Sequence, residues 1–333
     1  MAERGSAPLE GAELLLADLD GVVYRGPRAI AYAVESINAA PCRVGYITNN
    51  ASRTPESVAG HLNSFGLSVA APDVVTSAQA GVRLLAGLVP SGATVLVVGG
   101  EGLVAEAERA GFAVTASADD APAGVVQGFS PELGWRQLAE AAFALALDDA
   151  GEGIPWVATN MDWSIPVARG VAPGNGTLVS AVHSAVGRMP VVAGKPEVAI
   201  FEEAFDRFGT RRALFVGDRL DTDILGARRA GIPSAMVLTG IDRAKQLLAA
   251  RADMRPDFIL EDLRQLQQPY PVTTTKRDGS RIVGRARVRV DGNRVEIVAP
   301  GDRGIDLLRA ACAAIWDSGL GIHALEVPAS LYS

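Results

Sequence analysis

Residues 13–24 read Glu-Leu-Leu-Leu-Ala-Asp-Leu-Asp-Gly-Val-Val-Tyr, an apolar run that ends in two carboxylates, Asp18 and Asp20. A uniformly apolar run of this length suits a parallel β-strand that is covered on both faces. In an open α/β sheet, ligands bind at the carboxyl ends of the strands. Two carboxylates two residues apart repel each other unless a cation or a specific task holds them there. This stretch therefore predicts a charged site at the end of a buried strand.

The chain up to residue 266 repeats this alternation of strand and helix. Seven short apolar segments are predicted strands, at 13–17, 43–48, 94–99, 124–127, 156–158, 212–217 and 234–238. Four segments between them are predicted helices, at 55–65, 131–147, 196–208 and 221–230. Several of these helices have proline in the first turn, where it is tolerated. The alternation predicts the α/β class, with a doubly wound parallel sheet and helices on both faces.

The sequence changes character after Leu266. The predicted elements there are a linker at 267–275, one strand at 281–290, a turn at 291–293, a return strand at 295–298 and an amphipathic helix at 305–316. The long strand is predicted because arginine alternates strictly with apolar residues. The apolar stripe of the helix consists of Ile305, Leu308, Cys312 and Ile315. Residues 271–333 are therefore predicted to form a small ββα module, whose stripe docks on the rest of the chain or on a second chain.

The composition narrows the functional classes. At about 150 residues per domain, 333 residues suggest two domains and a third small one. The 31 Lys and Arg against 38 Asp and Glu give a net charge of −7, which argues against binding to nucleic acid or to an anionic membrane. Cys42 and Cys312 form no zinc motif. Because no apolar run approaches about 18 residues and no apolar signal core follows residues 1–4, we expect a cytoplasmic protein.

Further polar groups stand at positions comparable to that of the first carboxylate pair. They are Thr48, Asn49 and Asn50 after the second predicted strand, Lys195 before a predicted helix, and Asp218, Asp221 and Asp223 after the sixth strand. Mg²⁺ prefers hard oxygen ligands and is held by one or two carboxylates together with phosphate and water. A lysine can offset the remaining phosphate charge. The set predicts a site for Mg²⁺ and a phosphate, and hence phosphoryl chemistry.

Together these groups resemble the four motifs of the haloacid dehalogenase-like phosphatases. In chain order the motifs are Asp18-x-Asp20-Gly21, Thr48, Lys195 and Gly217-Asp218-x-x-x-x-Asp223. The neighbouring Asp-Gly-Val-Val-Tyr and Ile-Thr-Asn-Asn sequences resemble the subgroup that has a large inserted cap. The resemblance covers residues 12–266. It implies a catalytic core at 12–76 and 191–266 and an α/β cap domain at 77–190 that selects the substrate.

The resemblance also implies a role for each motif residue. Asp18 would be the nucleophile that forms an aspartyl-phosphate, and Asp20 the acid that protonates the leaving alkoxide and then activates water. The implied Mg²⁺ site consists of Asp18, the backbone carbonyl of Asp20, and Asp218, with Asp223 orienting a metal-bound water. The implied phosphate-binding groups are Thr48, Asn49, Asn50 and the neutralising Lys195.

Two cap residues are candidates for binding the non-phosphate end of the substrate. Asn160 and Asp162 lie in Ala158-Thr159-Asn160-Met161-Asp162, which resembles a cap-loop motif of the subgroup. An Asx turn explains the same residues without any ligand. The substrate implied by the resemblance is a small phosphorylated metabolite. Glycerol 3-phosphate comes first, followed by 2-phosphoglycolate, pyridoxal phosphate or a nucleoside monophosphate.

Two other functional classes stay open from the sequence. A phosphomutase or phosphotransferase would share the four motifs, whereas a non-catalytic sugar-phosphate-binding module would need no acid at Asp20. The C-terminal strand pair and helix resemble a fragment of a GCN5-related acetyltransferase (GNAT), with residues 300–304 in place of that family's glycine-rich loop. The module is too short to supply that whole fold. We therefore expect a structural or dimerisation module there, which could make the chain a homo-oligomer.

Overall fold

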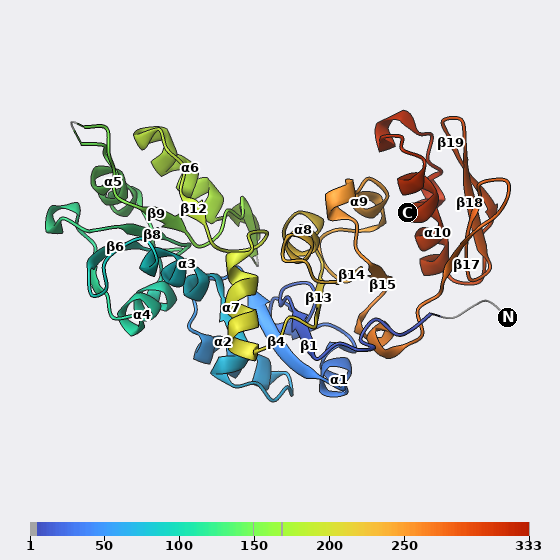
Figure 1. The fold of residues 1–333 in the computed structure, drawn as a ribbon, viewed down its shortest axis with the longest axis horizontal. Helices are drawn as coiled ribbons and strands as arrows, with labels where there is room; N and C mark the ends of the chain where they lie inside the picture. Colours follow the sequence, from blue (N-terminus) through green and yellow to red (C-terminus); the bar gives the residue numbers. More distant parts are fainter. Residues whose placement is uncertain (1–4, 149, 168, 333) are drawn as a thin grey trace. The chain divides into compact units, whose positions relative to one another are not determined.

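The computed structural model describes residues 5–148, 150–167 and 169–332. The chain divides into two compact units, one made of residues 1–44 and 210–333 and the other of residues 45–209 (Figure 1). Residues 1–4, on which the expectation about a signal sequence partly rests, lie outside the described residues. Among the described helices, none has the length and apolar character that crossing a membrane requires.

The first unit contains four parallel strands in the order β15-β14-β13-β1. They are β1 (Leu14–Ala17), β13 (Ala213–Gly217), β14 (Ser234–Val237) and β15 (Phe258–Leu260). The other elements of this part are the hairpin β2 (Tyr24–Arg25) and β3 (Arg28–Ala29) and the helices α1 (Ala33–Asn38), α8 (Leu225–Arg229) and α9 (Ala244–Leu248). Because Ala17 pairs with Val216, Asp18 and Asp218 emerge at the same edge of the sheet.

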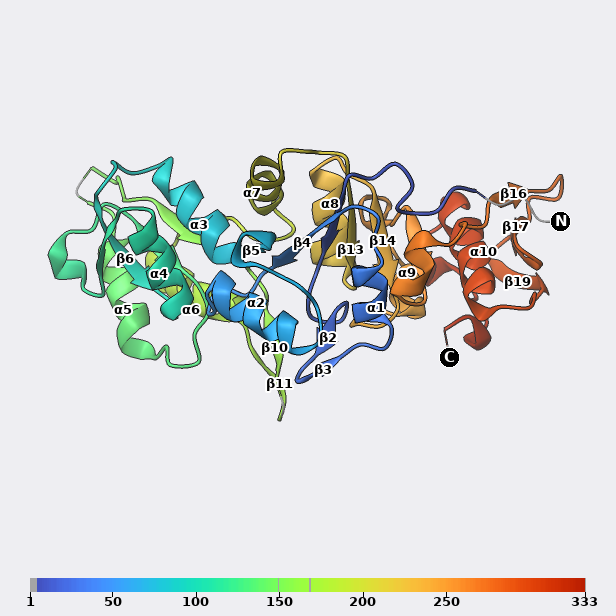
Figure 2. The ribbon, with the colours of Figure 1, turned by 90° about the horizontal axis from the view of Figure 1, so that it is seen from below.

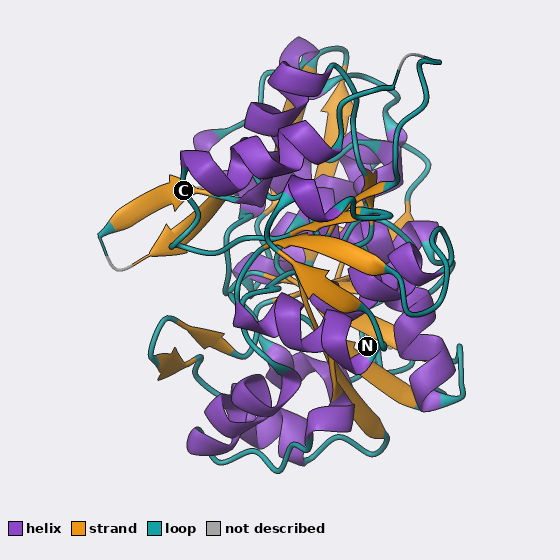
Figure 3. Cartoon of the chain, turned by 90° about the vertical axis from the view of Figure 1, so that its left-hand side faces the viewer, coloured by secondary structure: helices purple, strands orange, loops and turns teal. Residues whose placement is uncertain are grey.

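The second unit contains a parallel sheet of its own, in the order β12-β9-β8-β6-β7. Its strands are β6 (Thr94–Val98), β7 (Ala113–Thr115), β8 (Val125–Gln127), β9 (Trp156–Ala158) and β12 (Val191–Val192). A further parallel pair is β4 (Arg43–Thr48), which begins at the unit boundary, and β5 (Val74–Thr76). The strands β10 (Ser164–Val167) and β11 (Gly170–Pro173) form a projecting hairpin (Figures 2 and 3).

Helices cover both faces of the five-stranded sheet. They are α3 (Ser77–Ala86), α4 (Glu101–Arg109), α5 (Trp135–Ala144) and α6 (Asn175–Val186), and α2 (Pro55–Ser64) and α7 (Ala199–Phe208) complete the unit. The α5 and α6 side buries an apolar cluster that includes Leu96, Val125 and Trp156. Helices α3 and α4 lie on the other side of the sheet (Figure 1). This arrangement is the predicted α/β class, with helices on both faces of a parallel sheet.

All seven predicted strands form, but three of the four predicted helices differ at their starts. The helix predicted at 131–147 spans only Trp135–Ala144, because the chain is extended at Gly134 and the Gln137 side chain accepts a hydrogen bond from the Gly134 N–H (3.0 Å). The helix predicted at 196–208 begins at Ala199. The helix predicted at 221–230 begins with a π-helical turn at Leu220–Ile224 before α8.

The C-terminal module has four antiparallel strands where the sequence predicted two. They are β16 (Thr273–Thr275), β17 (Arg281–Val283), β18 (Ala286–Asp291) and β19 (Arg294–Ala299), followed by α10 (Gly304–Asp317). The single strand predicted at 281–290 is wrong, because Gly284 (φ +57°) and Arg285 form a two-residue turn inside it. The turn shifts the buried positions from odd in β17 (Val283) to even in β18 (Ala286 and Val288), whereas the prediction placed even positions inside throughout. The threonines predicted as linker form the edge strand β16.

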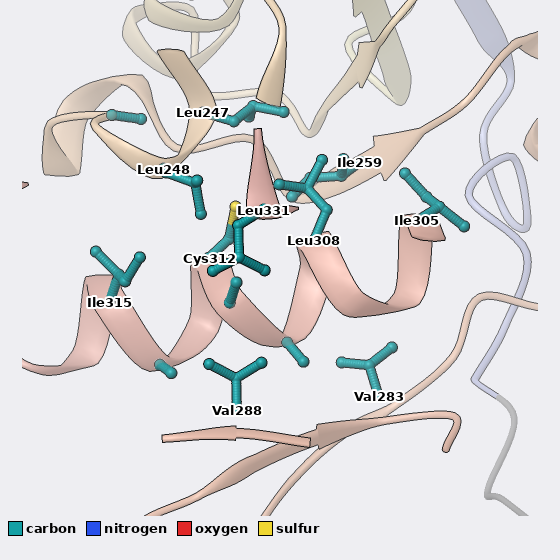
Figure 4. Close-up of a cluster of buried hydrophobic side chains, with 14 of the residues drawn as sticks. Leu247, Leu248, Ile259, Val283, Val288, Ile305, Leu308, Cys312, Ile315 and Leu331 are labelled. Carbon is teal, nitrogen blue, oxygen red and sulfur yellow. The ribbon is translucent and has the colours of Figure 1, made fainter. Parts of the chain in front are cut away.

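The stripe of α10 docks on the first unit's own core, as one of the two predicted alternatives. Leu308 and Cys312 are buried in a cluster that also contains Leu247, Leu248 and Ile259 (Figure 4). On its other side, α10 packs on the inner face of the four-stranded sheet (Figure 4). The module therefore completes a shared hydrophobic core.

Arg309 adds a polar anchor to this apolar contact. Its side chain is 4% exposed, and its guanidinium donates to the carbonyl oxygen of Ile259 on β15 (2.9 Å from Nε) and to Asp306 (2.9 Å) and Gln265 (3.0 Å). It also lies 4.5 Å from the ring centroid of Tyr270. A buried charge is stable only when it is hydrogen-bonded and paired, and these partners satisfy that condition.

Candidate active site

Three buried carboxylates lie together at the carboxyl ends of β1 and β13. Asp18 follows β1, Asp218 follows β13, and Asp223 lies in the π-helical turn. One carboxylate oxygen of each lies within 4.8 Å of the other two, and the residues are 8%, 1% and 1% exposed. Like charges buried so close together repel one another, and a bound cation would offset this repulsion. The donor set is made of hard oxygens and fits a divalent ion such as Mg²⁺.

Asp223 fixes the main chain around Asp218. Its Oδ2 atom accepts hydrogen bonds from the backbone N–H groups of Asp218 (3.0 Å) and Arg219 (3.1 Å). Gly217 leaves room for this contact, since a Cβ atom there would lie 2.3 Å from the Cβ atom of Asp223. The glycine of the fourth motif is therefore required by the carboxylate that follows it. Asp223 thus positions the backbone of the fourth motif, and its implied role of orienting a metal-bound water stays a prediction.

Residues 239–242, after β14, hold Asp218 from the opposite side. The backbone N–H of Ile241 donates to the Oδ2 atom of Asp218 (2.6 Å), and the backbone N–H of Asp242 donates to the Asp218 carbonyl oxygen (3.1 Å). One oxygen of the carboxylate is thereby committed to the protein, and the orientation of the side chain is fixed. The site predicted from the sequence did not include this segment.

The backbone of two glycines packs directly against the Asp218 carboxylate. A Cβ atom at Gly240 would lie 1.7 Å from Oδ2 of Asp218, and one at Gly21 would lie 2.2 Å from the same atom. Gly21 also has φ +84°, which other residues rarely adopt. The hydroxyl of Thr239 donates to the Gly21 carbonyl oxygen (2.7 Å) and joins the two glycine segments. A Thr-Gly pair directly after a predicted strand was the sequence signal that could have revealed this contribution.

The other acidic residues of the two aspartate motifs have different environments. Asp20 is exposed, and its implied role as an acid stays a prediction. Asp221 is also exposed and pairs with Arg219 (2.9 Å), so it stabilises the loop surface. Asp242 accepts a hydrogen bond from the Leu220 N–H (2.7 Å), while burial raises the pKa of its carboxyl group.

The second unit holds the remaining motif residues. Thr48 ends β4, and its hydroxyl oxygen accepts a hydrogen bond from the Asn50 N–H (3.1 Å). The Asn50 side chain is directed to the loop and accepts from the Ser52 N–H (2.9 Å). Asn49 Oδ1 accepts from the backbone N–H of Lys195 (2.8 Å), a residue that is only 3% exposed. The structure thus brings the loop after β4 and the predicted lysine together.

The cap-loop residues Asn160 and Asp162 also lie against this loop. The Oδ1 atom of Asn160 accepts from the Asp162 N–H (3.1 Å), which is the Asx turn considered as the alternative explanation. The Nδ2 atom of Asn160 donates to the Asn49 carbonyl oxygen (2.7 Å). The half-buried Asp162 carboxylate accepts from Asn49 Nδ2 (3.2 Å). Asn160 therefore shapes the loop, and Asp162 presents a carboxylate beside Asn49.

The start of α6 supports the cap loop. Asn175 is 1% exposed and donates from Nδ2 to the Asn160 carbonyl oxygen (2.8 Å). A Cβ atom at Gly174 would lie 2.1 Å from the carbonyl oxygen of Asp162, and one at Gly176 would lie 2.4 Å from another carbonyl oxygen of the loop. The helix start and the loop are therefore in direct backbone contact.

Comparison with known families agrees with this geometry. Residues 15–113 match the family model of haloacid dehalogenase-like hydrolases, and residues 192–266 match a second, HAD-hydrolase-like model. The chain belongs to the haloacid dehalogenase-like hydrolases. This membership confirms the resemblance inferred from the four motifs.

Similar proteins include named phosphatases. D-glycerol 3-phosphate phosphatase of Mycobacterium tuberculosis is 43% identical over 309 residues, which span 92% of this chain and 86% of that protein. Glycerol-3-phosphate phosphatase of Gallus gallus is 32% identical, over 79% of this chain and 94% of that protein. The crystal structure of the Mycobacterium tuberculosis glycerol phosphate phosphatase in complex with magnesium superposes with a TM-score of 0.86 at 40% identity, over 97% of this chain and 95% of that one.

The C-terminal module matches a further model. Residues 286–330 match a GCN5-related N-acetyltransferase-like domain, as the resemblance predicted. At the position compared with a glycine-rich loop, Gly301 has φ +71°, and a Cβ atom there would lie 2.7 Å from the backbone nitrogen of Ala286. This glycine therefore serves the close packing of the loop on β18, which fits a structural role for the module.

Proposed function

We propose that this chain is a Mg²⁺-dependent phosphatase of small phosphomonoesters, with glycerol 3-phosphate as its substrate. The observation that carries the proposal is the cluster of Asp18, Asp218 and Asp223, three buried carboxylates with oxygens within 4.8 Å of one another. The names of the similar proteins support the substrate, and the magnesium complex of one of them supports the ion. When bound by Asp18, Asp218 and the Asp20 carbonyl, Mg²⁺ would draw charge from the phosphate oxygens.

The chemistry divides into two proton-coupled steps. An oxygen of Asp18 attacks phosphorus and the bond to the leaving oxygen breaks, while Asp20 gives that oxygen its proton, so a neutral alcohol and an aspartyl-phosphate result. Asp20 then takes a proton from water, the water oxygen attacks phosphorus, and the bond to Asp18 breaks to release phosphate. The exposure of Asp20 suits both proton transfers. The Thr48 hydroxyl and the Lys195 ammonium would bind and neutralise phosphate oxygens.

We assign the catalytic core to residues 12–76 and 191–266 and the substrate-selecting cap to residues 77–190. The separate five-stranded sheet supports the cap, with Asp162 as its contact to the leaving group. The C-terminal module at 271–333 is assigned a structural role, because its helix is committed to the shared core. We place the protein in the cytoplasm, where the thiols of Cys42 and Cys312 stay reduced.

A phosphate-release assay tests the proposed function. The panel contains glycerol 3-phosphate, 2-phosphoglycolate, pyridoxal 5′-phosphate and a nucleoside monophosphate, each with Mg²⁺ and after treatment with EDTA. We expect the highest kcat/KM for glycerol 3-phosphate and no turnover in EDTA. The Asp18→Asn variant should keep its melting temperature and lose at least about 10³-fold in kcat, because an amide is a poor nucleophile.

Three outcomes would contradict this assignment. Substantial turnover by Asp18→Asn would remove Asp18 from the nucleophile role. Transfer of the phosphoryl group to an added alcohol, without release of phosphate, would indicate a phosphotransferase. Saturable binding of the substrates without any reaction in the wild-type protein would indicate a binding module.

A further inference from the structure

The carboxamide of Asn49 joins two segments that are far apart in the sequence. Its Oδ1 atom accepts a hydrogen bond from the Lys195 N–H (2.8 Å), and its Nδ2 atom donates to the Lys195 carbonyl oxygen (3.0 Å). The same Nδ2 atom donates to Oδ2 of Asp162 in the cap loop (3.2 Å). One side chain therefore holds the backbone of the motif lysine and the carboxylate of the cap loop at the same time.

Only an amide of this length can make these three bonds. An amide nitrogen has two hydrogens, and here one is directed to Lys195 and the other to Asp162. An aspartate at position 49 would keep the acceptor and lose both donors, and it would place its negative charge beside the Asp162 carboxylate. With both hydrogens engaged, the Asn49 side chain has no donor left for a phosphate. Its role is therefore different from that of a direct phosphate ligand.

The Asn49 backbone is held as firmly as its side chain. Its carbonyl oxygen accepts from Asn160 Nδ2 (2.7 Å) and from the Ser77 hydroxyl (2.6 Å). Gly194 leaves the space for the carboxamide, since a Cβ atom there would lie 2.7 Å from Asn49 Oδ1. A side chain fixed at both ends transmits the position of one partner to the other, because it has no rotamer freedom with which to absorb a displacement.

We propose that Asn49 is a positioning residue that sets the place of the Lys195 ammonium group and couples it to Asp162. This inference rests on the proposed phosphatase function, in which Lys195 neutralises the transferring phosphoryl group. Lys195 is 3% exposed, so its charge has few alternative positions, and a small shift of its backbone moves the charge away from the phosphate. A leaving group that binds Asp162 orders the cap loop and, through Asn49, the lysine.

The test compares Asn49→Asp with the wild-type protein on p-nitrophenyl phosphate, whose leaving group offers no hydroxyl to the cap loop. We expect kcat to fall about 10- to 100-fold with a small change in KM, because the lysine charge is used mainly in the transition state. The affinity for orthovanadate should fall by a similar factor, and the affinity for inorganic phosphate should fall less.

A matched control exists in the same unit. The Asn63 carboxamide makes the same pair of bonds to one residue, accepting from the Val69 N–H (2.7 Å) and donating to the Val69 carbonyl oxygen (2.9 Å). Asn63→Asp likewise keeps the acceptor and removes the amide donor, at a site that contains no motif residue. We expect it to lower the melting temperature and to leave kcat and the vanadate affinity unchanged.

A second arm leaves position 49 intact and remains informative if Asn49→Asp fails to fold. Asp162→Asn keeps an oxygen acceptor for the Asn49 amide, whereas Asp162→Ala removes it. On p-nitrophenyl phosphate we expect the kcat of Asp162→Ala to be several-fold lower than that of Asp162→Asn. Equal kcat values for wild type, Asp162→Ala and Asn49→Asp would overturn the inference. An inactive wild-type protein would instead refute the proposed function, so the two failures are distinguishable.

Discussion

Two regions of the first unit use different strands of its parallel sheet for opposite purposes. At the carboxyl ends of β1 and β13, three like charges are buried side by side and two glycines leave bare backbone around Asp218. Around β14 and β15, hydrocarbon side chains of α9 and α10 fill a shared cluster, and the buried Arg309 is fully paired. The first region is the proposed ligand site and carries a cost in stability, whereas the second supplies stability. Substitutions in the two regions should therefore have separable effects.

The largest effect is expected at the acidic end. Asp218→Asn preserves the shape of the side chain and removes one charge of the three. We expect kcat to fall at least about 10²-fold and the Mg²⁺ requirement to rise, because a charged oxygen donor is lost. In EDTA the free energy of unfolding should rise by up to about 1 kcal/mol, because repulsion is relieved. Mg²⁺ titrations of turnover and urea unfolding measure the two quantities, and a loss of stability in EDTA would contradict the comparison.

The second effect is expected in the shared cluster. Leu308 is 5% exposed, so Leu308→Ala should cost about 2–4 kcal/mol of unfolding free energy. At a temperature well below the melting transition, kcat and KM should stay at the wild-type values. Val298 on the same module is 44% exposed, and Val298→Ala serves as the control, with a change within about 0.5 kcal/mol. If Leu308→Ala lowered kcat at unchanged stability, the two regions would not be independent.

The smallest effect is a difference between the labelling rates of two cysteine thiols. Cys312 is fully buried in the cluster, and burial raises the pKa of its thiol; Cys42 is half-buried, and burial raises its pKa as well. Because the thiolate is the reactive form, we expect slow labelling of Cys42 and labelling of Cys312 only on unfolding. A chromogenic disulfide reagent used on wild type and Cys42→Ser measures this. Rapid reaction of the Cys42→Ser protein would show that the Cys312 thiol is accessible in the folded protein and that α10 does not bury it.

The sequence predicted the strands of both parallel sheets better than it predicted the C-terminal module. Uniformly apolar runs bounded by polar residues marked β1, β4 and β13, because a strand buried on both faces leaves that pattern. The prediction for the module was wrong at Gly284 and Arg285, where a two-residue turn separates two strands that each alternate apolar and polar residues. No period distinguishes one strand of this kind from two. The three threonines of β16 were the available clue, since β-branched residues favour strands.

At the candidate site, the sequence predicted the residues that carry charge and missed those that hold them. Asp18, Asp218 and Asp223 were found because carboxylates at strand ends are rare without a task. Asn49 was predicted to bind phosphate, but the partners of its carboxamide, Lys195 and Asp162, are more than 100 residues away, and such tertiary contacts leave no local pattern. Gly240 was missed although Thr239 and Gly240 directly follow a predicted strand, because the requirement for glycine there comes from the side chain of Asp218.

The division of the chain into units also bears on how the protein is made. Strand β1 is fully buried beside β13, yet nearly 200 residues of chain separate them, and the intervening residues 45–209 form the other unit. On the ribosome, residues 45–209 can fold while Leu14–Leu16 still have no partner in β13. At about 5–20 residues per second, the residues between β1 and the end of β13 need roughly 10 to 40 s. During that interval the nascent chain presents an apolar strand to the cell, so the first unit depends on chaperones more than the second does.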